Sequence, residues 1–223
     1  MRPARPRRAH PTPVSYMEDR NSALDLLEEE VRSCSLCGLA RERTRAVPGE
    51  GSRKADIMFI GEGPGYYEDQ QGRPFVGPAG QLLEQLLASI GLGRSDVYIT
   101  NMVKCRPPNN RDPLPGEIQA CGPYLDRQIE LIDPKVIVAL GRYSFSKFFP
   151  GEAISRARGK PRRWGRRIVF PMYHPAAALR NGRLRPLLEE DFRRLPQLVQ
   201  EAAQADADQG EQPEQGQQLS FFE

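Results

Sequence analysis

The segment at residues 55–87 (ADIMFIGEGPGYYEDQQGRPFVGPAGQLLEQLL) limits the possible fold more than any other part of the sequence. Its apolar run at residues 57–60 predicts a buried strand, and its end carries leucines at helical spacing. Between the two lie glycines, prolines, carboxylates and aromatic residues. Open α/β sheets place their ligand sites in such loops, just beyond the carboxyl ends of strands. We therefore expect a functional site in this loop.

Three further apolar runs, at residues 97–101, 136–140 and 168–172, predict more buried strands. Helical patterns lie between them and follow the last one. Strands that alternate with helices form a parallel sheet with helices on both faces. The sequence thus predicts an α/β fold in which four strands end in polar loops on one rim.

The length and the charge distribution predict one domain with two tails. We expect a disordered basic arm over residues 1–20, a folded domain over residues 21–198, and a flexible acidic tail rich in glutamine over residues 199–223. Seven of the 32 lysines and arginines lie at residues 156–167 and predict a basic surface, for which a polyanion is the natural partner. The alternative is a solvated loop without a partner.

The sequence also indicates a compartment and a metal site. No apolar run is long enough to span a membrane, and the Arg-rich start lacks the apolar segment of a secretion signal, so we expect a soluble cytoplasmic protein. Cysteines in that compartment seldom form disulfides, so Cys34, Cys37, Cys105 and Cys121 predict a metal site. Their spacing fits zinc or an iron–sulfur cluster and slightly favours zinc. Four unrelated buried cysteines are the alternative.

The loop after the first strand does not fit a dinucleotide site. Tyr66 stands where the sixth-position glycine of G-x-G-x-x-G is needed, and Pro64 lacks the backbone N–H that a phosphate would use. The rim instead brings together Glu62, Asn101 and His174, the one histidine of the folded part. A structural histidine and a strand-end cap at the asparagine are the alternatives. We expect a catalytic site.

These residues stand in motifs that resemble the family-4 uracil-DNA glycosylases, the iron–sulfur members of their superfamily. The matching pieces are GEGPGYYEDQQGRPFVGPAGQLL, TNMVKCRPPNNRDP, HPAAALR and the spacing of all four cysteines. The resemblance implies a three-layer α/β/α sandwich around a four-stranded parallel sheet. It also implies a 4Fe–4S cluster, rather than zinc, on the cysteines.

The resemblance further implies a monofunctional enzyme that flips uracil out of DNA and excises it by hydrolysis. Phe75 would stack on the uracil ring, and Asn101 would read its O4 and N3–H edge. Glu68 would lie near C5 and exclude the methyl group of thymine. His174 would donate a hydrogen bond to O2, and Glu62 would either position water or stabilise the cationic sugar.

Several other residues would contact the DNA, which the enzyme would bind as a monomer. Gly63 would allow close approach of the strand, and Leu179 or Arg180 would fill the space left by the flipped base. The residues expected to contact phosphates are Lys104, Arg106 and the arginines of residues 156–167, among them Arg162 and Arg163. The alternative function is a non-catalytic DNA-binding module stabilised by its metal, which would not need Glu62, Asn101 and His174 on one rim.

The end of the chain carries a separate signal. Gln218, Leu219, Ser220, Phe221 and Phe222 resemble the peptide with which bacterial proteins bind the sliding clamp. The tail before it would act as a flexible tether.

Overall fold

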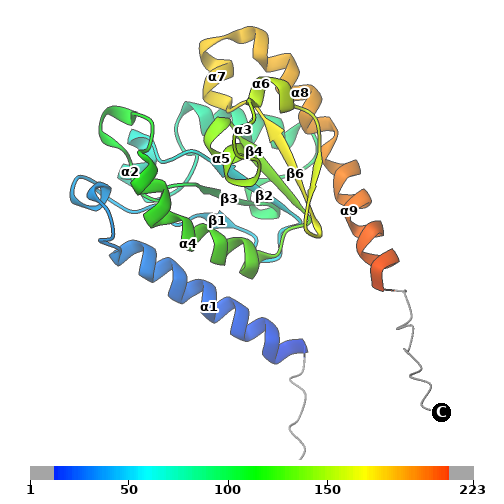
Figure 1. The fold of residues 1–223 in the computed structure, drawn as a ribbon, viewed down its shortest axis with the longest axis horizontal. Coiled ribbons are helices and arrows are strands. Elements are labelled where there is room, and N and C mark those ends of the chain that lie inside the picture. The colour runs from blue at the N-terminus through cyan, green and yellow to red at the C-terminus, as the bar shows by residue number, and fades with distance from the viewer. Residues whose placement is uncertain (1–12, 211–223) are drawn as a thin grey trace, which may run out of the picture.

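A mixed sheet lies at the centre of the protein in the computed structural model, which describes residues 13–210 (Figure 1). Its strands are β1 (Glu50–Gly51), β2 (Ile57–Gly61), β3 (Tyr98–Asn101), β4 (Val136–Leu140), β5 (Arg162–Trp164) and β6 (Arg167–Met172). Their order across the sheet is β1-β3-β2-β4-β6-β5. The inner strands β3, β2, β4 and β6 are parallel, and the edge strands β1 and β5 are antiparallel to their neighbours.

The predicted sheet of four parallel strands lacks two antiparallel strands that the structure has at its edges. The sheet has six strands and is mixed. Neither edge strand carries an apolar run: β1 is a glutamate and a glycine, and β5 is two arginines and a tryptophan. Short polar edge strands are common in proteins because they discourage pairing with another chain. The same property hides them from a search for apolar runs.

The inner strands are mostly apolar and are buried apart from Arg167 at the start of β6, because both faces of the sheet are covered. Successive side chains point to opposite faces, so Phe59 and Phe170 belong to one core and Met58 and Val169 to the other. On the first face Phe59 stacks against Phe192, with ring centroids 5.6 Å apart. The sheet therefore lies between two packed cores.

The helices are α1 (Pro13–Ser33), α2 (Tyr66–Gln71), α3 (Pro78–Ala88), α4 (Pro115–Ile132), α5 (Arg142–Phe148), α6 (Ile154–Ala157), α7 (Pro175–Arg180), α8 (Arg185–Arg193) and α9 (Leu195–Gly210). Leucines of α3 and apolar residues of α8 and α9 fill the core on one face. Residues of α1, α4 and α5 fill the core on the other. α1 lies alongside α4 (Figure 1). No helix among residues 13–210 is both long and apolar enough to cross a membrane.

The first and last helices extend into the segments that the sequence predicts as tails. α1 begins at Pro13, so residues 13–20 of the expected disordered arm are helical. α9 continues to Gly210, past the expected start of the tail, because Leu198 and Ala202 repeat the helical spacing and pack into the core. The rest of the arm and the proposed clamp-binding peptide at residues 218–222 lie outside the described residues.

The carboxyl ends of the four parallel strands lie together at one end of the sheet, as predicted. Gly61 of β2 pairs with Asn101 of β3, and Leu140 of β4 pairs with Met172 of β6. The loops that follow these residues therefore share one rim, which is where doubly wound sheets place their ligands.

Candidate active site

A cavity of about 310 Å³ opens at this rim. Its wall contains seven of the residues expected at the site: Glu62, Gly63, Glu68, Phe75, Asn101, His174 and Arg180. They come from the end of β3, from the loops after β2, α2 and β6, and from α2 and α7. Sequence reasoning placed all of these residues at one site, and the parallel strand order brings them together.

Asn101 presents an unused hydrogen-bond acceptor in this wall. The residue is only 2% exposed, and its side-chain oxygen Oδ1 has no hydrogen-bond partner within the described residues. A buried polar atom without a partner is costly, and a ligand that donates to it would remove that cost. Gly61 is required beside it, because an added Cβ there would lie 2.3 Å from Oδ1 and 2.7 Å from the Phe75 ring.

His174 is held in one tautomer by the helix that it caps. Its Nδ1 accepts a hydrogen bond from the backbone N–H of Ala176 at 3.1 Å, so in the neutral ring Nε2 carries the proton. Burial, with help from the charge of Arg180, lowers the pKa of His174 to about 4. The ring also stacks against Phe75, with centroids 5.4 Å apart. His174 is therefore a neutral hydrogen-bond donor at physiological pH.

Glu62 and Glu68 are the two carboxylates that line the cavity. The carboxylate of Glu68 accepts hydrogen bonds from the backbone of its loop, and that of Glu62 accepts none within residues 13–210. Glu62 follows β2, and its backbone carbonyl accepts from the N–H of Val103 at 3.1 Å, which joins the loops after β2 and β3. Burial raises the pKa of Glu62 and the charge of Asp112 adds to this, while Arg142 and Arg180 act in the opposite direction. The side chain thus places a negative charge in a poorly solvated part of the site.

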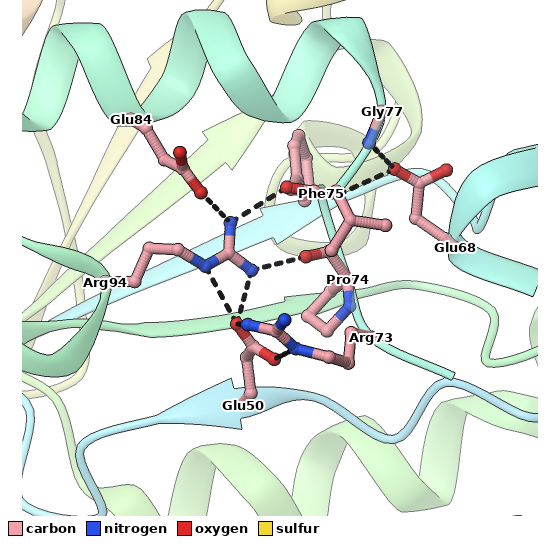
Figure 2. Close-up of polar contacts among 9 residues, drawn as sticks. Glu50, Glu68, Arg73, Pro74, Phe75, Gly77, Glu84 and Arg94 are labelled. Carbon is pink, nitrogen blue, oxygen red and sulfur yellow. Dashed lines mark hydrogen bonds and ion pairs between the residues drawn. The ribbon is translucent and has the colours of Figure 1, made fainter. Parts of the chain in front are cut away.

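Glu68 has a structural task that its predicted role did not include. Its Oε1 accepts from the backbone N–H groups of Val76 and Gly77 at 2.9 and 2.8 Å (Figure 2). Its Oε2 accepts from the N–H of Gly65 at 3.1 Å. The carboxylate therefore ties the start of α2 to the backbone that directly follows Phe75. Its contact with C5 of a base stays a prediction.

The predicted contact of Lys104 with phosphate is wrong in this structure. The residue is 1% exposed, and its Nζ donates to Thr100 Oγ1 at 2.6 Å, to the carbonyl of Asn101 at 2.7 Å and to Gln128 Oε1 at 2.6 Å. Burial lowers its pKa to about 7. Lys104 therefore supports the end of β3 from inside the core and does not reach solvent.

The other residues predicted to contact DNA fall into two groups. Leu179, exposed on α7, and Arg106, stacked over Tyr66 at 5.3 Å, stand near the cavity. Arg162 and Arg163 do not, because they pair with Val169 and Ile168 in the first half of β6, whereas the cavity lies beyond its end. Arg162 also forms an ion pair with Glu152. The structure thus separates this part of the basic segment from the cavity.

The four cysteines, which come from two widely separated parts of the sequence, line one small cavity. Backbone N–H groups of Leu36 and Lys104 donate to the sulfurs of Cys34 and Cys121 at 3.5 and 3.3 Å. The guanidinium of Arg43 donates to Cys105 at 3.0 Å. Across residues 13–210, no three cysteine, histidine or acidic side chains are arranged to hold one metal ion. The cysteines are brought together as predicted, but without a site for a single ion.

Two polar residues of the cavity wall, Asn110 and Arg111, were not assigned a role from the sequence. Asn110 and Arg111 enter it from the loop between β3 and α4, and Arg111 is fixed by two hydrogen bonds to Glu117 at 2.9 and 2.7 Å. Both stand in the quoted TNMVKCRPPNNRDP segment. Their place in that segment was the signal that could have identified them.

Comparisons with known proteins agree with these features. Residues 48–197 match the model of the uracil DNA glycosylase superfamily. The chain is 56% identical over 187 residues to the type-4 uracil-DNA glycosylase of Sulfurisphaera tokodaii, a match that covers 79% of this chain and 85% of the relative. It is 50% identical to that of Archaeoglobus fulgidus (79% and 93% covered) and 47% identical to that of Thermotoga maritima (82% and 98% covered).

The state of His174 can be tested by NMR. The sequence has two histidines, so a His10→Gln variant leaves His174 as the one imidazole. Because its pKa is lowered to about 4, we expect a neutral ring with the proton on Nε2 from pH 8 down to about 5. Arg180→Gln should raise the midpoint, since it removes a nearby positive charge. A midpoint near 6.5, or a proton on Nδ1, would contradict the assignment.

The same shift predicts how stability depends on pH. The folded protein holds His174 below its usual pKa, so the unfolded chain binds more protons between pH 6.5 and pH 4. Above pH 6.5 the imidazole is neutral in both states, so His174 does not lower the free energy of unfolding. As the pH falls from 6.5 to 4, the free energy of unfolding decreases, because the unfolded chain takes up a proton that folded His174 does not.

Proposed function

The chain belongs to the type-4 uracil-DNA glycosylases of the uracil-DNA glycosylase superfamily, and we propose that it removes uracil from DNA by hydrolysing the N-glycosidic bond, which leaves an abasic site. One observation of the structure carries the proposal. A buried acceptor that has no partner among residues 13–210, a neutral imidazole donor and a flat aromatic ring line the same cavity. Such a cavity suits a small planar base that offers both a donor and acceptors.

Recognition of uracil would depend on Asn101 and Phe75. A base inside a duplex cannot enter a cavity, so the nucleotide must first be flipped out. The Oδ1 of Asn101 would accept the N3–H of uracil, and its amide N–H would donate to O4. Cytosine offers an acceptor at N3 and a donor at C4, and would leave both atoms of the amide unpaired. Phe75 would cover the face of the ring, and Glu68 at C5 would exclude the methyl group of thymine.

The chemistry would depend on His174 and Glu62. When the glycosidic bond breaks, negative charge moves onto uracil and positive charge remains on the sugar. The Nε2–H of His174 would donate to O2 as that charge develops, in a part of the site where solvent cannot weaken the hydrogen bond. Glu62 would supply the negative charge needed beside the sugar, either to position the attacking water or to stabilise the cation.

The rim of the cavity would hold the DNA strand. Gly63 lines the cavity without a side chain that would block the backbone, while Leu179 and Arg180 lie together on α7. They would fill the space vacated by the flipped nucleotide. A non-catalytic DNA-binding module is not favoured, because it has no use for Glu62, Asn101 and His174 in one cavity.

We propose that the four cysteines hold a 4Fe–4S cluster, with zinc as the alternative. A single zinc ion needs four sulfurs about 2.3 Å from one point. In a cluster each cysteine binds a different iron, so the sulfurs can lie farther apart. Backbone N–H donors to the sulfurs of Cys34 and Cys121 suit such a cluster, whose sulfurs accept hydrogen bonds. When bound, the cluster would join α1, the loop after β3 and α4.

Excision is tested with a uracil-containing oligonucleotide, single- or double-stranded, treated with alkali after incubation. We expect strand cleavage with the unmodified protein, and its absence in both substrates would defeat the proposed function. His174→Ala and Asn101→Ala should keep DNA binding and each lose about 10²–10³ in the rate of excision, the usual effect of removing one such hydrogen-bonding group. Arg163→Gln, far from the cavity, is the matched control. Full activity in either cavity variant would overturn the site assignment.

The cluster is tested on the purified protein by iron and zinc analysis. We expect a brown preparation with iron, and Cys121→Ser should lose iron and unfold at a lower temperature because the group joins three parts of the fold. A colourless preparation that contains zinc would refute the cluster.

The C-terminal peptide is proposed to bind a bacterial sliding clamp. A pull-down would compare the full chain with one that lacks residues 218–223. We expect the truncated chain to lose retention by the clamp and to keep its rate of excision. Equal retention of the two chains would rule the proposal out.

A further inference from the structure

The backbone at Phe75 has a conformation that needs outside support. Phe75 has a φ of 52°, in the left-handed region, which bulky side chains rarely adopt. The residue is nevertheless almost fully buried, with only 5% of its surface exposed, and its ring stacks against that of His174. The position of the ring in the cavity therefore depends on whatever holds this unfavourable backbone in place.

Arg94 holds the two carbonyl groups at this point of the loop. It begins the short helix η2 (Arg94–Asp96), and its side chain is 16% exposed. Its Nη1 donates to the carbonyl of Phe75 at 2.8 Å, and its Nη2 donates to the carbonyl of Pro74 at 2.5 Å (Figure 2). One guanidinium thus fixes two consecutive peptide groups, as its planar fork of donors allows.

Glu50 holds Arg94 in turn. The Nε and Nη2 of Arg94 both donate to Glu50 Oε1, at 2.8 and 2.5 Å. Burial alone would raise the pKa of Glu50, but hydrogen bonds from Arg73 and Arg94 hold it below its usual value, so the group stays ionised. Arg73 contacts this carboxylate from the solvent side, with 56% of its side chain exposed. A charged pair at the sheet edge therefore orients the guanidinium.

The other side of the loop is closed by the contacts of Glu68 and α3. Glu68 accepts from the N–H groups of Val76 and Gly77, which directly follow the carbonyls that Arg94 holds (Figure 2). Gly80 of α3 packs against the same turn, where an added Cβ would lie 1.8 Å from the carbonyl oxygen of Phe75. The peptide groups around Phe75 are thus held from both directions.

From this geometry we infer that Arg94, oriented by Glu50, is a positioning residue that sets the Phe75 ring against the base in the cavity. The inference rests on the proposed function. Neither Arg94 nor Glu50 lines the cavity, so the effect reaches the base through the backbone of Phe75. Without the guanidinium, the loop would relax toward an ordinary φ and the ring would leave its place beside His174. The loss would fall on binding of the base, since the groups proposed to act on the glycosidic bond lie on other loops.

The test compares Arg94→Gln with Arg73→Gln, which removes a cation from the same Glu50 but leaves both carbonyl contacts in place. We expect Arg94→Gln to raise the inhibition constant of free uracil and the KM for uracil-containing DNA by about tenfold, the size of a lost base–aromatic stack. Binding to DNA with an abasic site and kcat should change by less than about threefold. Arg73→Gln should leave all four quantities close to those of the unmodified protein.

A double-variant cycle separates positioning from a general structural role. Phe75→Ala should weaken uracil binding about as much as Arg94→Gln does, and the double variant should be no worse than Phe75→Ala alone, because the two residues act through one ring. Additive losses would overturn the inference. So would an Arg94→Gln variant that excises uracil and binds it within twofold of the unmodified protein.

A second substitution keeps the inference testable if Arg94→Gln does not fold. Arg94→Lys retains the charge, but one ammonium cannot reach Glu50 and two carbonyls in the planar arrangement of a guanidinium. The same rise in the uracil inhibition constant is expected, and an unchanged constant would refute the inference. Failure of the proposed function looks different: the unmodified protein itself would not excise uracil.

Discussion

The hydrogen bonds of Lys104 join the parts of the protein that the proposed function uses. An ammonium group inside a core is tolerated only when its donors are paired, and Nζ has three acceptors, one of them the carbonyl of Asn101. The backbone N–H of the same residue donates to Cys121, and its carbonyl accepts from Val47. One residue thus connects the cavity, the cysteines and the segment that leads into β1. Cys121 and Asn101 are therefore neighbours in one hydrogen-bonded unit, even though no cysteine lines the cavity.

The cavity combines groups that are poorly satisfied before a ligand binds. Asn101 has a buried oxygen without a partner, His174 is kept neutral, and the pKa of Glu62 is raised by burial. Water would satisfy such groups better than this cavity does, so their arrangement costs stability that the two packed cores must offset. The same arrangement makes them ready for a substrate whose charges appear only as its bond breaks, because fixed dipoles in a dry site need not reorganise.

The sequence predicted the rim of the sheet well because the signal there is local. Each of the four apolar runs marks a buried strand, and parallel strands must end together, so Glu62, Asn101 and His174 could be placed on one rim. Lys104 could not be predicted in this way. It follows a polar strand end and precedes prolines, which is typical of an exposed loop, and the acceptor that completes its burial, Gln128, lies in α4. The contact of Arg94 with Phe75 is likewise long-range, and a positive φ at phenylalanine has no signature in the chain.

The basic segment at residues 156–167 shows why a count of charges overstates what DNA can use. Arg158 pairs with the buried Asp191, Arg162 pairs with Glu152, and Arg166 and Arg167 both reach Asp133. Counterion release follows the number of phosphates that a protein neutralises, and a guanidinium already paired with a carboxylate contributes less to it. Four of the seven cations of this segment are therefore already paired with carboxylates, one of them in α8. Among the residues that line the cavity are Arg111, which is paired with Glu117, and Arg180, so the positive charge at the cavity does not depend on this segment.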